Sequence, residues 1–304
     1  HFLVAGGSSM SGTVLDSVLD YVRILFHVDL IKISTMVHEI KKYEAELLLL
    51  YEEIGKIDTM LSIASYRASL GAYAVPEFEK GAGNAGVLTI QGMYHPLVEN
   101  PVRNDLAMKK SILLTGSNAS GKSTFLKAAA INILFAQTIH TVCAGRYSAS
   151  FYRIFSSMAL RDDILAKESY FVVEVKSLKR LFDREKASDI PVFCFVDEIL
   201  RGTNTVERVA ASSLLLEALA GKNAVCMAAT HDIELTYLLE DIYENYHFEE
   251  RVADGTISFD YLLKEGRAKS RNALLLMESL GFEKEITEKA KKRADVFLQE
   301  GIWE

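Results

Sequence analysis

One stretch of this chain constrains its fold more than any other. Residues 111–124 contain a short apolar run, then the pattern G-x-x-x-x-G-K-S, then the start of a helical pattern. A strand, a glycine-rich turn and a helix in this order form the loop that binds phosphate groups in many nucleotide-binding proteins. Gly116 and Gly121 permit backbone angles that side chains forbid, so successive N–H groups can point at phosphate oxygens. The stretch predicts that the chain binds a nucleoside triphosphate.

The residues of this loop have separate expected roles. Lys122 is expected to be a solvent-facing side chain that reaches the β- and γ-phosphates, and the Ser123 hydroxyl is expected to hold Mg²⁺. The helix that starts near Lys122 adds its positive dipole end at the same place. A chance Gly-Lys-Ser turn on a surface loop is the alternative, and the strand and helix around the loop disfavour it. The predicted ATP-binding set is Gly116, Ser117, Asn118, Ala119, Ser120, Gly121, Lys122, Ser123 and Thr124.

Composition describes an ordinary globular chain whose length suggests two domains. Apolar residues make up 49% of it and charged residues 25%, and the formal net charge is −7. This charge gives no global basic field for nucleic acid, but it does not exclude a local basic patch. Cys143, Cys194 and Cys226 are isolated in apolar surroundings, so we expect reduced core thiols.

The first residue and the most apolar segment bear on the location of the protein. The first residue is His1 and not Met, so we expect a fragment of a longer polypeptide. No signal-peptide pattern follows, and we expect a cytoplasmic protein, with membrane attachment through an upstream region left open. The most apolar stretch, residues 128–144, contains several polar side chains and follows the glycine loop directly. A buried helix is therefore expected there and not a membrane span.

The first part of the chain has a helical pattern. Apolar residues recur at steps of three and four from Leu15 to about Ala74. We expect packed helices in which Met36, Tyr43 and Tyr51 belong to the core. Pro76 and the glycines between residues 81 and 86 then break the pattern. The predicted domains are a helical segment at 1–80 and a nucleotide-binding domain at 81–304.

After this boundary, short apolar runs alternate with helical patterns. Runs that are apolar at every position, such as 192–196, are typical of a sheet covered on both faces. The sequence therefore predicts an α/β domain with a mainly parallel sheet. The expected strands are 87–91, 111–115, 151–156, 192–196, 224–229 and 257–262, and the expected helices are 125–141, 170–185, 205–220, 234–239, 272–280 and 283–298.

Two carboxylates, Asp197 and Glu198, directly follow the apolar run 192–196. In enzymes with such a phosphate-binding loop, the first carboxylate binds Mg²⁺ directly or through water. The second orients and deprotonates the attacking water. A strand that merely ends in acidic turn residues is the alternative, which the loop disfavours. We predict Ser123 and Asp197 as metal ligands and Glu198 as a catalytic residue, an arrangement that favours hydrolysis over nucleotide storage.

Two segments follow this acidic pair. Asn204, with Glu207 three residues later, is expected to cap the helix 205–220, a role compatible with a subunit-contacting loop. His231 follows the run 224–229. A His at the carboxyl end of a sheet strand points into the crevice where ligands bind, so we expect it to contact the γ-phosphate or the attacking water. A hydrogen-bonded structural role is the alternative.

With these motifs in this order, the chain resembles the ATPase part of the MutS family. The family's phosphate-binding loop with Asn and Gly-Lys-Ser-Thr appears at 116–124, its Asp-Glu-x-x-Arg-Gly-Thr-x-Thr at 197–205 and its Thr-His pair at 230–231. Its His-Pro-hydrophobic-Val-Glu appears at 95–99, and residues 162–174 and 266–270 resemble two further family segments. The resemblance covers about residues 87–300 and extends weakly back through 57–76, the end of the family's helical core domain.

The resemblance implies an ABC-type P-loop ATPase fold preceded by a helical segment, with ATP and Mg²⁺ as ligands. It implies a homodimer in which the C-terminal helices mediate dimerisation and the partner's Ser169 segment completes each site, with Thr203 as a second candidate for action across the interface. DNA is the partner that the family suggests, in transactions of the mismatch-repair kind.

Several departures and alternatives limit this expectation. Tyr170 replaces the family's usual Thr, and residues 101–104 lack the aromatic that often stacks on adenine. No Phe-x-Glu mismatch-reading domain is present, so mismatch recognition is not assigned. An ATPase of the transporter or chromosome-maintenance kind would carry Leu-Ser-Gly-Gly-Gln before the acidic strand, whereas residues 167–171 read Lys-Glu-Ser-Tyr-Phe. A nucleotide-gated scaffold without turnover is the remaining alternative, and Glu198 disfavours it.

Overall fold

The computed structural model of the chain describes residues 14–78, 88–117, 120–158, 170–186, 190–221, 223–253, 256–268, 277–278 and 281–300. The chain divides into two compact units, residues 1–66 and 67–304. Most of the helix predicted at 272–280 lies outside the described residues.

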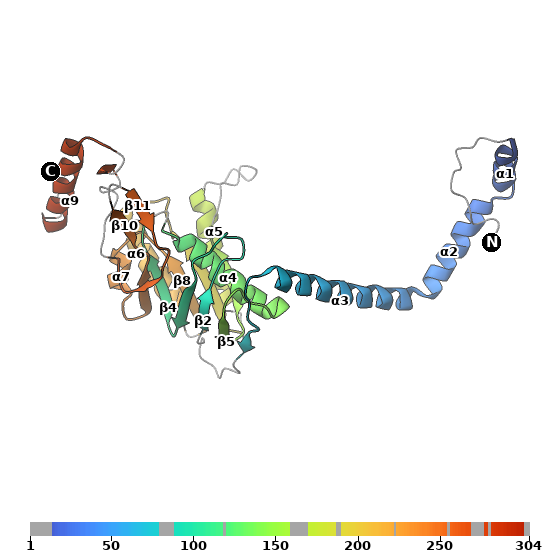
Figure 1. Cartoon of the computed structure of the whole chain (residues 1–304), viewed down its shortest axis with the longest axis horizontal. Helices are drawn as coiled ribbons and strands as arrows, with labels where there is room; N and C mark the ends of the chain where they lie inside the picture. Colours follow the sequence, from blue (N-terminus) through green and yellow to red (C-terminus); the bar gives the residue numbers. More distant parts are fainter. Residues whose placement is uncertain are drawn as a thin grey trace. The chain divides into compact units, whose positions relative to one another are not determined.

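Unit 1 is helical, as predicted. It contains α1 (Val14–Leu25), α2 (Val28–Lys42) and most of α3 (Glu44–Ser69), drawn in blue shades in Figure 1. The expected core is wrong, because no side chain of α2 or α3 is buried. Met36, Tyr43 and Tyr51 are 58%, 45% and 79% exposed. An apolar helix face leaves water only against a second layer of structure, and the described residues supply none for these helices.

The larger sheet of unit 2 has the strand order β12-β9-β4-β8-β7-β6. β12 pairs antiparallel with β9, and the other neighbouring strands pair in parallel, so the predicted mainly parallel sheet is confirmed. The strand bounds are β4 (Ser111–Thr115), β6 (Arg153–Ser157), β7 (Val192–Asp197), β8 (Ala224–Ala229), β9 (Tyr243–His247) and β12 (Lys264–Glu265).

Helices cover both faces of this sheet, which explains why its strands β7 and β8 are apolar at nearly every position. Along β7, Phe193 and Phe195 pack into a core with α4 (Lys122–Ile139). Val192, Cys194 and Val196, which alternate with these phenylalanines, pack into a second core on the opposite face. The helices of that second face are α5 (Tyr170–Lys186), α6 (Thr205–Leu219) and α7 (Glu234–Leu238). Figure 1 labels these elements.

A smaller sheet with the order β1-β5-β2-β3 adds to the core below α4. Its strands are β1 (Glu77–Phe78), β2 (Leu88–Met93), β3 (Asn104–Met108) and β5 (Arg146–Ala149). A hairpin of β10 (Glu250–Ala253) and β11 (Thr256–Phe259) and the helix α9 (Lys284–Glu300) complete the described elements of unit 2.

The predicted strands and helices of unit 2 that fall on described residues are present, with shifted ends. The strand expected at 151–156 begins at Arg153, and the one expected at 257–262 ends at Phe259. The helix expected from residue 125 begins three residues earlier, directly after Gly121. The strands β1, β3, β5, β9, β10 and β12 were not predicted.

Two other predictions concern buried groups. Cys143, Cys194 and Cys226 are buried and form no disulfide within the described part of the chain, as expected for reduced core thiols. Residues 128–139 of the apolar stretch 128–144 belong to α4, in which Ala128, Ala129, Asn132, Ile133 and Ala136 are buried, and residues 140–144 lie beyond the end of the helix. None of the helices that the structure describes combines the length and apolarity that crossing a bilayer requires.

Candidate functional site

Three neighbouring parallel strands bring the predicted site residues to one edge of the sheet. β8 lies between β4 and β7, so the segments that follow these strands lie side by side. The glycine loop follows β4, Glu198 follows β7 and His231 follows β8. Two backbone hydrogen bonds extend the ladder past the strand ends, from Glu198 N–H to Ala229 O and from Thr230 N–H to Leu114 O. The carboxyl edge of a parallel sheet is where ligands bind in such folds.

The glycine loop is held in place by close contacts. Gly116 has φ +140°, and a Cβ atom there would lie 2.8 Å from Phe248 O and 2.9 Å from the Ser120 hydroxyl oxygen. The Ser120 hydroxyl donates to Ser117 O, and the Ser117 hydroxyl donates to a Glu250 carboxylate oxygen at 2.7 Å. Glycine is therefore required at position 116 for both backbone angle and space.

Lys122 is buried and not solvent-facing, which corrects the prediction for its side chain. It is 4% exposed, and its Nζ donates to Gly116 O at 2.7 Å and to Ser117 O at 2.8 Å. Burial lowers the pKa of Lys122 to about 8, against the opposing effect of Glu198, Asp197 and Glu250. The loop curls around its own lysine, and the ammonium satisfies two carbonyls that would otherwise point inward without a donor.

Glu198, His231 and Arg201 form a hydrogen-bonded group beside the loop. The Nε2 atom of His231 lies 2.8 Å from Glu198 Oε1 and 3.4 Å from Lys122 Nζ. The other carboxylate oxygen of Glu198 pairs with Arg201 at 2.7 Å. Asp232, next to His231, forms a two-point pair with Arg208 of α6. The structure thus brings together Lys122, Glu198 and His231, which the sequence placed in three separate motifs.

Asp197 is the last residue of β7, and one of its carboxylate oxygens accepts no hydrogen bond from the described residues. Its Oδ1 is buried and has no hydrogen-bond partner among the described residues. Buried carboxylate oxygens without a donor are rare in native proteins, and a cation is one ordinary explanation. The part of the chain that the structure describes contains no cluster of three His, Cys, Asp or Glu side chains arranged for a metal. Any ion held by Asp197 would therefore depend on other oxygen ligands.

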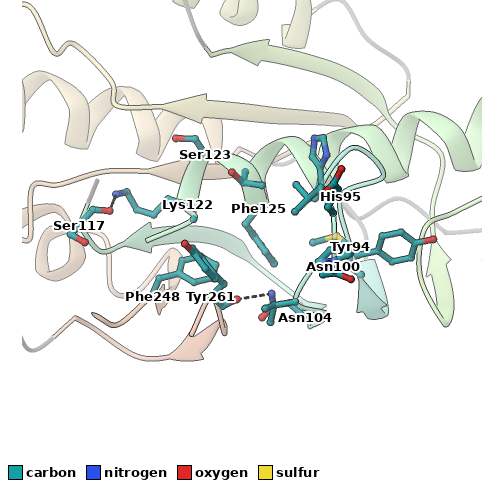
Figure 2. A pocket seen from close by; sticks show the side chains of 18 residues that line it. Tyr94, His95, Asn100, Asn104, Ser117, Lys122, Ser123, Phe125, Phe248 and Tyr261 are labelled. Carbon is teal, nitrogen blue, oxygen red and sulfur yellow. Dashed lines mark hydrogen bonds between the residues drawn. The ribbon is translucent and has the colours of Figure 1, made fainter. Parts of the chain in front are cut away.

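A pocket of about 540 Å³ opens beside the loop. Figure 2 shows Ser117 and Lys122 at one end of it and Tyr94, His95 and Asn100 at the other, with Phe125, Phe248 and Tyr261 between them. The end at Lys122 is polar and cationic. The middle has aromatic walls. A pocket with these two parts fits a ligand that has an anionic end and a flat apolar end.

Tyr261 and Asn104 are pocket residues that the sequence did not indicate. Tyr261 has φ +52°, and its ring lies over Gly121, where an added Cβ would be 3.2 Å from Cδ1. The buried Asn104 amide donates to Tyr261 O at 2.9 Å and accepts from Leu263 N–H at 2.7 Å. Figure 2 draws the first of these bonds. These two bonds fix the turn that carries Tyr261. No local pattern links residues so far apart in the chain.

The remaining predicted residues are placed as follows. Ser123 and Thr124 line the pocket. Asn204 caps α6 as expected, accepting from Val206 N–H at 2.9 Å, whereas Glu207 accepts from the Thr203 hydroxyl and not from the cap. Asn118, Ala119 and Ser169 lie outside the described residues, as do residues 162–168 and 269–270 of the motifs quoted above.

Comparison with known proteins decides the family. The model of the family described as MutS domain V matches residues 112–297, which include β4 from its second residue, the glycine loop and every strand end of the site. The chain belongs to the MutS family.

Individual relatives agree with the MutS assignment. The DNA mismatch repair protein MutS of Thermotoga petrophila is 32% identical over 244 residues, which are 73% of this chain and 30% of that protein. MutS protein homolog 4 of Mus musculus is 30% identical over 270 residues, 82% of this chain and 27% of that protein. The chain thus spans less than a third of the length of these curated relatives.

Proposed function

We propose that this chain is a MutS-type ATPase that binds ATP with Mg²⁺ and hydrolyses its β–γ phosphoanhydride bond. The observation that carries the proposal is the meeting of Lys122, Glu198 and His231 at the carboxyl edge of three adjacent parallel strands. A glycine loop on one strand and a carboxylate two strands away are the arrangement that an ABC-type P-loop fold uses for phosphoryl transfer to water.

Each side chain has a distinct role in this proposal. The backbone N–H groups of the loop and the Lys122 ammonium bind the phosphates. To do so, Lys122 exchanges its bonds to Gly116 O and Ser117 O for phosphate oxygens. Glu198 accepts a proton from the attacking water, and His231 holds the Glu198 carboxylate and faces the γ-phosphate position.

The side chains present fit Mg²⁺. Asp197 supplies a buried carboxylate oxygen without a partner, and Ser123 supplies a hydroxyl at the pocket wall. Mg²⁺ prefers a few hard oxygen ligands from the protein, together with phosphate and water. When bound, the ion would neutralise part of the negative charge of the phosphates. Ser123 and Asp197 are the residues that would hold it.

The aromatic part of the pocket is proposed to bind the adenine base. Tyr261 offers a ring face above Gly121, and Phe248 lies beside it in the pocket. A flat base gains stacking and apolar burial between such rings. This assigns to Tyr261 the contact for which residues 101–104 supply no aromatic side chain.

The wider role is inferred from family membership. The relatives' names describe DNA mismatch repair, and we propose that ATP turnover here is coupled to DNA transactions of that kind. We propose a homodimer in the cytoplasm, with Ser169 and Thr203 acting across the interface and the C-terminal helices joining the subunits. In this proposal residues 1–80 are the end of a helical core domain and residues 81–304 are the ATPase domain. Nothing in the comparisons favours the transporter-like or chromosome-maintenance alternative.

Equilibrium binding of Mg-ATP tests the ligand assignment. We expect one ATP per chain for the wild type and for Glu198→Gln, and at least about tenfold weaker binding for Lys122→Met, which removes a phosphate-facing charge. Lys109→Met, an exposed lysine in the turn before β4, is the matched control and should bind as the wild type does. Unchanged affinity in a folded Lys122→Met protein would reject the site.

A further inference from the structure

A buried carboxylate occupies a position of α5 where an apolar residue would be expected. The buried stripe of this helix consists of Glu174, Ser177, Leu178 and Leu181, at helical spacing. Glu174 is 2% exposed. Burial raises the pKa of its carboxyl, the backbone N–H groups of Leu200 and Arg201 oppose the shift, and the charge of Glu198 adds to it. Burying such a group is costly, so its presence calls for a specific role.

The contact that Glu174 makes is with the loop that follows β7. Its Oε1 accepts a hydrogen bond from Leu200 N–H at 2.5 Å, and its Oε2 has no partner among the described residues. A second contact lies one turn earlier on α5. There, an added Cβ on Gly202 would lie 3.2 Å from Phe171 Cβ, so the loop passes directly against the helix. The first two turns of α5 thus touch the loop at two points.

The loop itself is strained and requires external support. Glu198 has φ +54° and Leu200 has φ +55°, a region that non-glycine residues seldom occupy. Such angles persist only where surrounding structure over-determines them. The Glu198 amide is held by Ala229 O of β8, and the Leu200 amide is held by Glu174. The Glu174 carboxylate of α5 therefore holds the strained backbone two residues beyond Glu198.

We infer that Glu174 is a positioning residue that couples the position of α5 to the Glu198 carboxylate. A displacement of α5 moves the Leu200 amide and the neighbouring Arg201, whose guanidinium pairs with Glu198. Glu198 is then turned toward the phosphate end of the pocket or away from it. The inference rests on the proposed function of Glu198 and adds the route by which a helix outside the pocket controls hydrolysis.

Turnover and binding should separate in variants of Glu174. We expect Glu174→Ala to bind ATP at one per chain with little change in affinity, while kcat falls about 10- to 100-fold, because small misplacements of a catalytic group are costly. Glu174→Gln keeps an oxygen for the Leu200 amide and should stay within about threefold of wild type. Glu217→Ala, at an exposed site on α6, is the matched control and should leave kcat unchanged. Equal kcat in Glu174→Ala and wild type would overturn the inference.

A double-mutant cycle distinguishes positioning from a general loss of structure. If Glu174 acts through Glu198, Glu174→Ala should have no further effect on the residual rate of Glu198→Gln. If the rate loss of the double variant equals the product of the two single losses, Glu174 acts independently of Glu198. That result would overturn this inference but not the proposed function. Should Glu198→Gln hydrolyse ATP as the wild type does, or should the wild type release no phosphate, the proposed function itself fails, and the inference with it.

Amide hydrogen exchange supplies a readout that does not depend on turnover. The Leu200 N–H loses its acceptor in Glu174→Ala, so exchange in residues 198–203 should accelerate while β4 and β8 stay protected. Glu217→Ala should leave this segment unchanged. Unaltered exchange in the segment in folded Glu174→Ala protein would mean that Glu174 does not hold the loop.

Discussion

Lys122 has an environment that its motif does not reveal. The motif indicates a lysine available to phosphates, but the side chain is withdrawn and bonded to two carbonyls of its own loop. Its pKa is lowered to about 8, first by burial. Keeping this cation buried therefore destabilises the free site, and a ligand with phosphate groups offsets that cost.

A pH dependence of ATP binding follows from this pKa. Phosphates favour the charged lysine, so binding raises the pKa, and affinity depends on the proton that the free lysine carries. Affinity should be constant from pH 7 to about 8 and then fall by up to about tenfold per pH unit, as the free lysine loses its proton. Calorimetric titration with Mg-ATP between pH 7 and 9.5 measures this fall.

Lys122→Arg is the control, because a guanidinium stays charged throughout this range. Its affinity for ATP should be weaker but nearly independent of pH. A wild-type affinity that does not change up to pH 9.5, or an equal fall in Lys122→Arg, would show that Lys122 does not titrate in the free site.

The lowered pKa of Lys122 also makes the stability of the folded chain depend on pH. Between pH 8 and the ordinary lysine value, the unfolded chain binds more protons at Lys122 than the folded chain does. Stability therefore rises with pH in this window, as far as Lys122 contributes.

At the scale of elements, the turn that follows β4 fits closely against its neighbours at Gly116. Gly116→Ala should destabilise the folded chain by about 1–3 kcal/mol, because it combines an unfavourable φ with a clash against Phe248 O. Gly266→Ala is a matched control: Gly266 has φ +92° but nothing within 4 Å of an added Cβ. Thermal unfolding should therefore show a larger loss for Gly116→Ala, and equal losses would contradict the close fit.

The sequence predicted elements well where apolar runs have both faces covered, and poorly where they do not. β7 and β8 were found because every residue except Asp197, at the end of β7, is apolar and packs in one core or the other. β9 lies inside the same sheet but reads Tyr-Glu-Asn-Tyr-His, with half-buried polar side chains at its middle. Its place is set by parallel pairing with β4, which no local pattern shows.

The site residues, too, divide into those that the sequence could locate and those that only the fold brings together. Motifs next to predicted strand ends, such as Glu198 and His231, could be placed because parallel strands share one carboxyl edge. Tyr261 and Asn104 meet only through the fold, across a separation of 157 residues. The sequence showed Glu174 only as one residue of a family motif. Its role could not be predicted, because its partner is the backbone N–H of Leu200, whose positive φ no sequence pattern reveals.

At the scale of the molecule, the two units differ in how they satisfy their apolar residues. Unit 2 buries them in two cores on either side of a sheet. In unit 1, the described helices keep residues such as Leu30, Tyr51 and Met60 largely exposed. The helical periodicity of this unit was predicted correctly, but periodicity shows only which side chains share a face and not what covers that face.

The central claim concerns chemistry in unit 2, and phosphate release from Mg-ATP tests it most directly. The wild-type chain should release phosphate steadily, and Glu198→Gln should release it at least about 100-fold more slowly while still binding one ATP per chain. The substitution keeps the size of the side chain and its contact with His231, so a loss of rate reports the missing base. Equal phosphate release by Glu198→Gln and wild type would contradict the account.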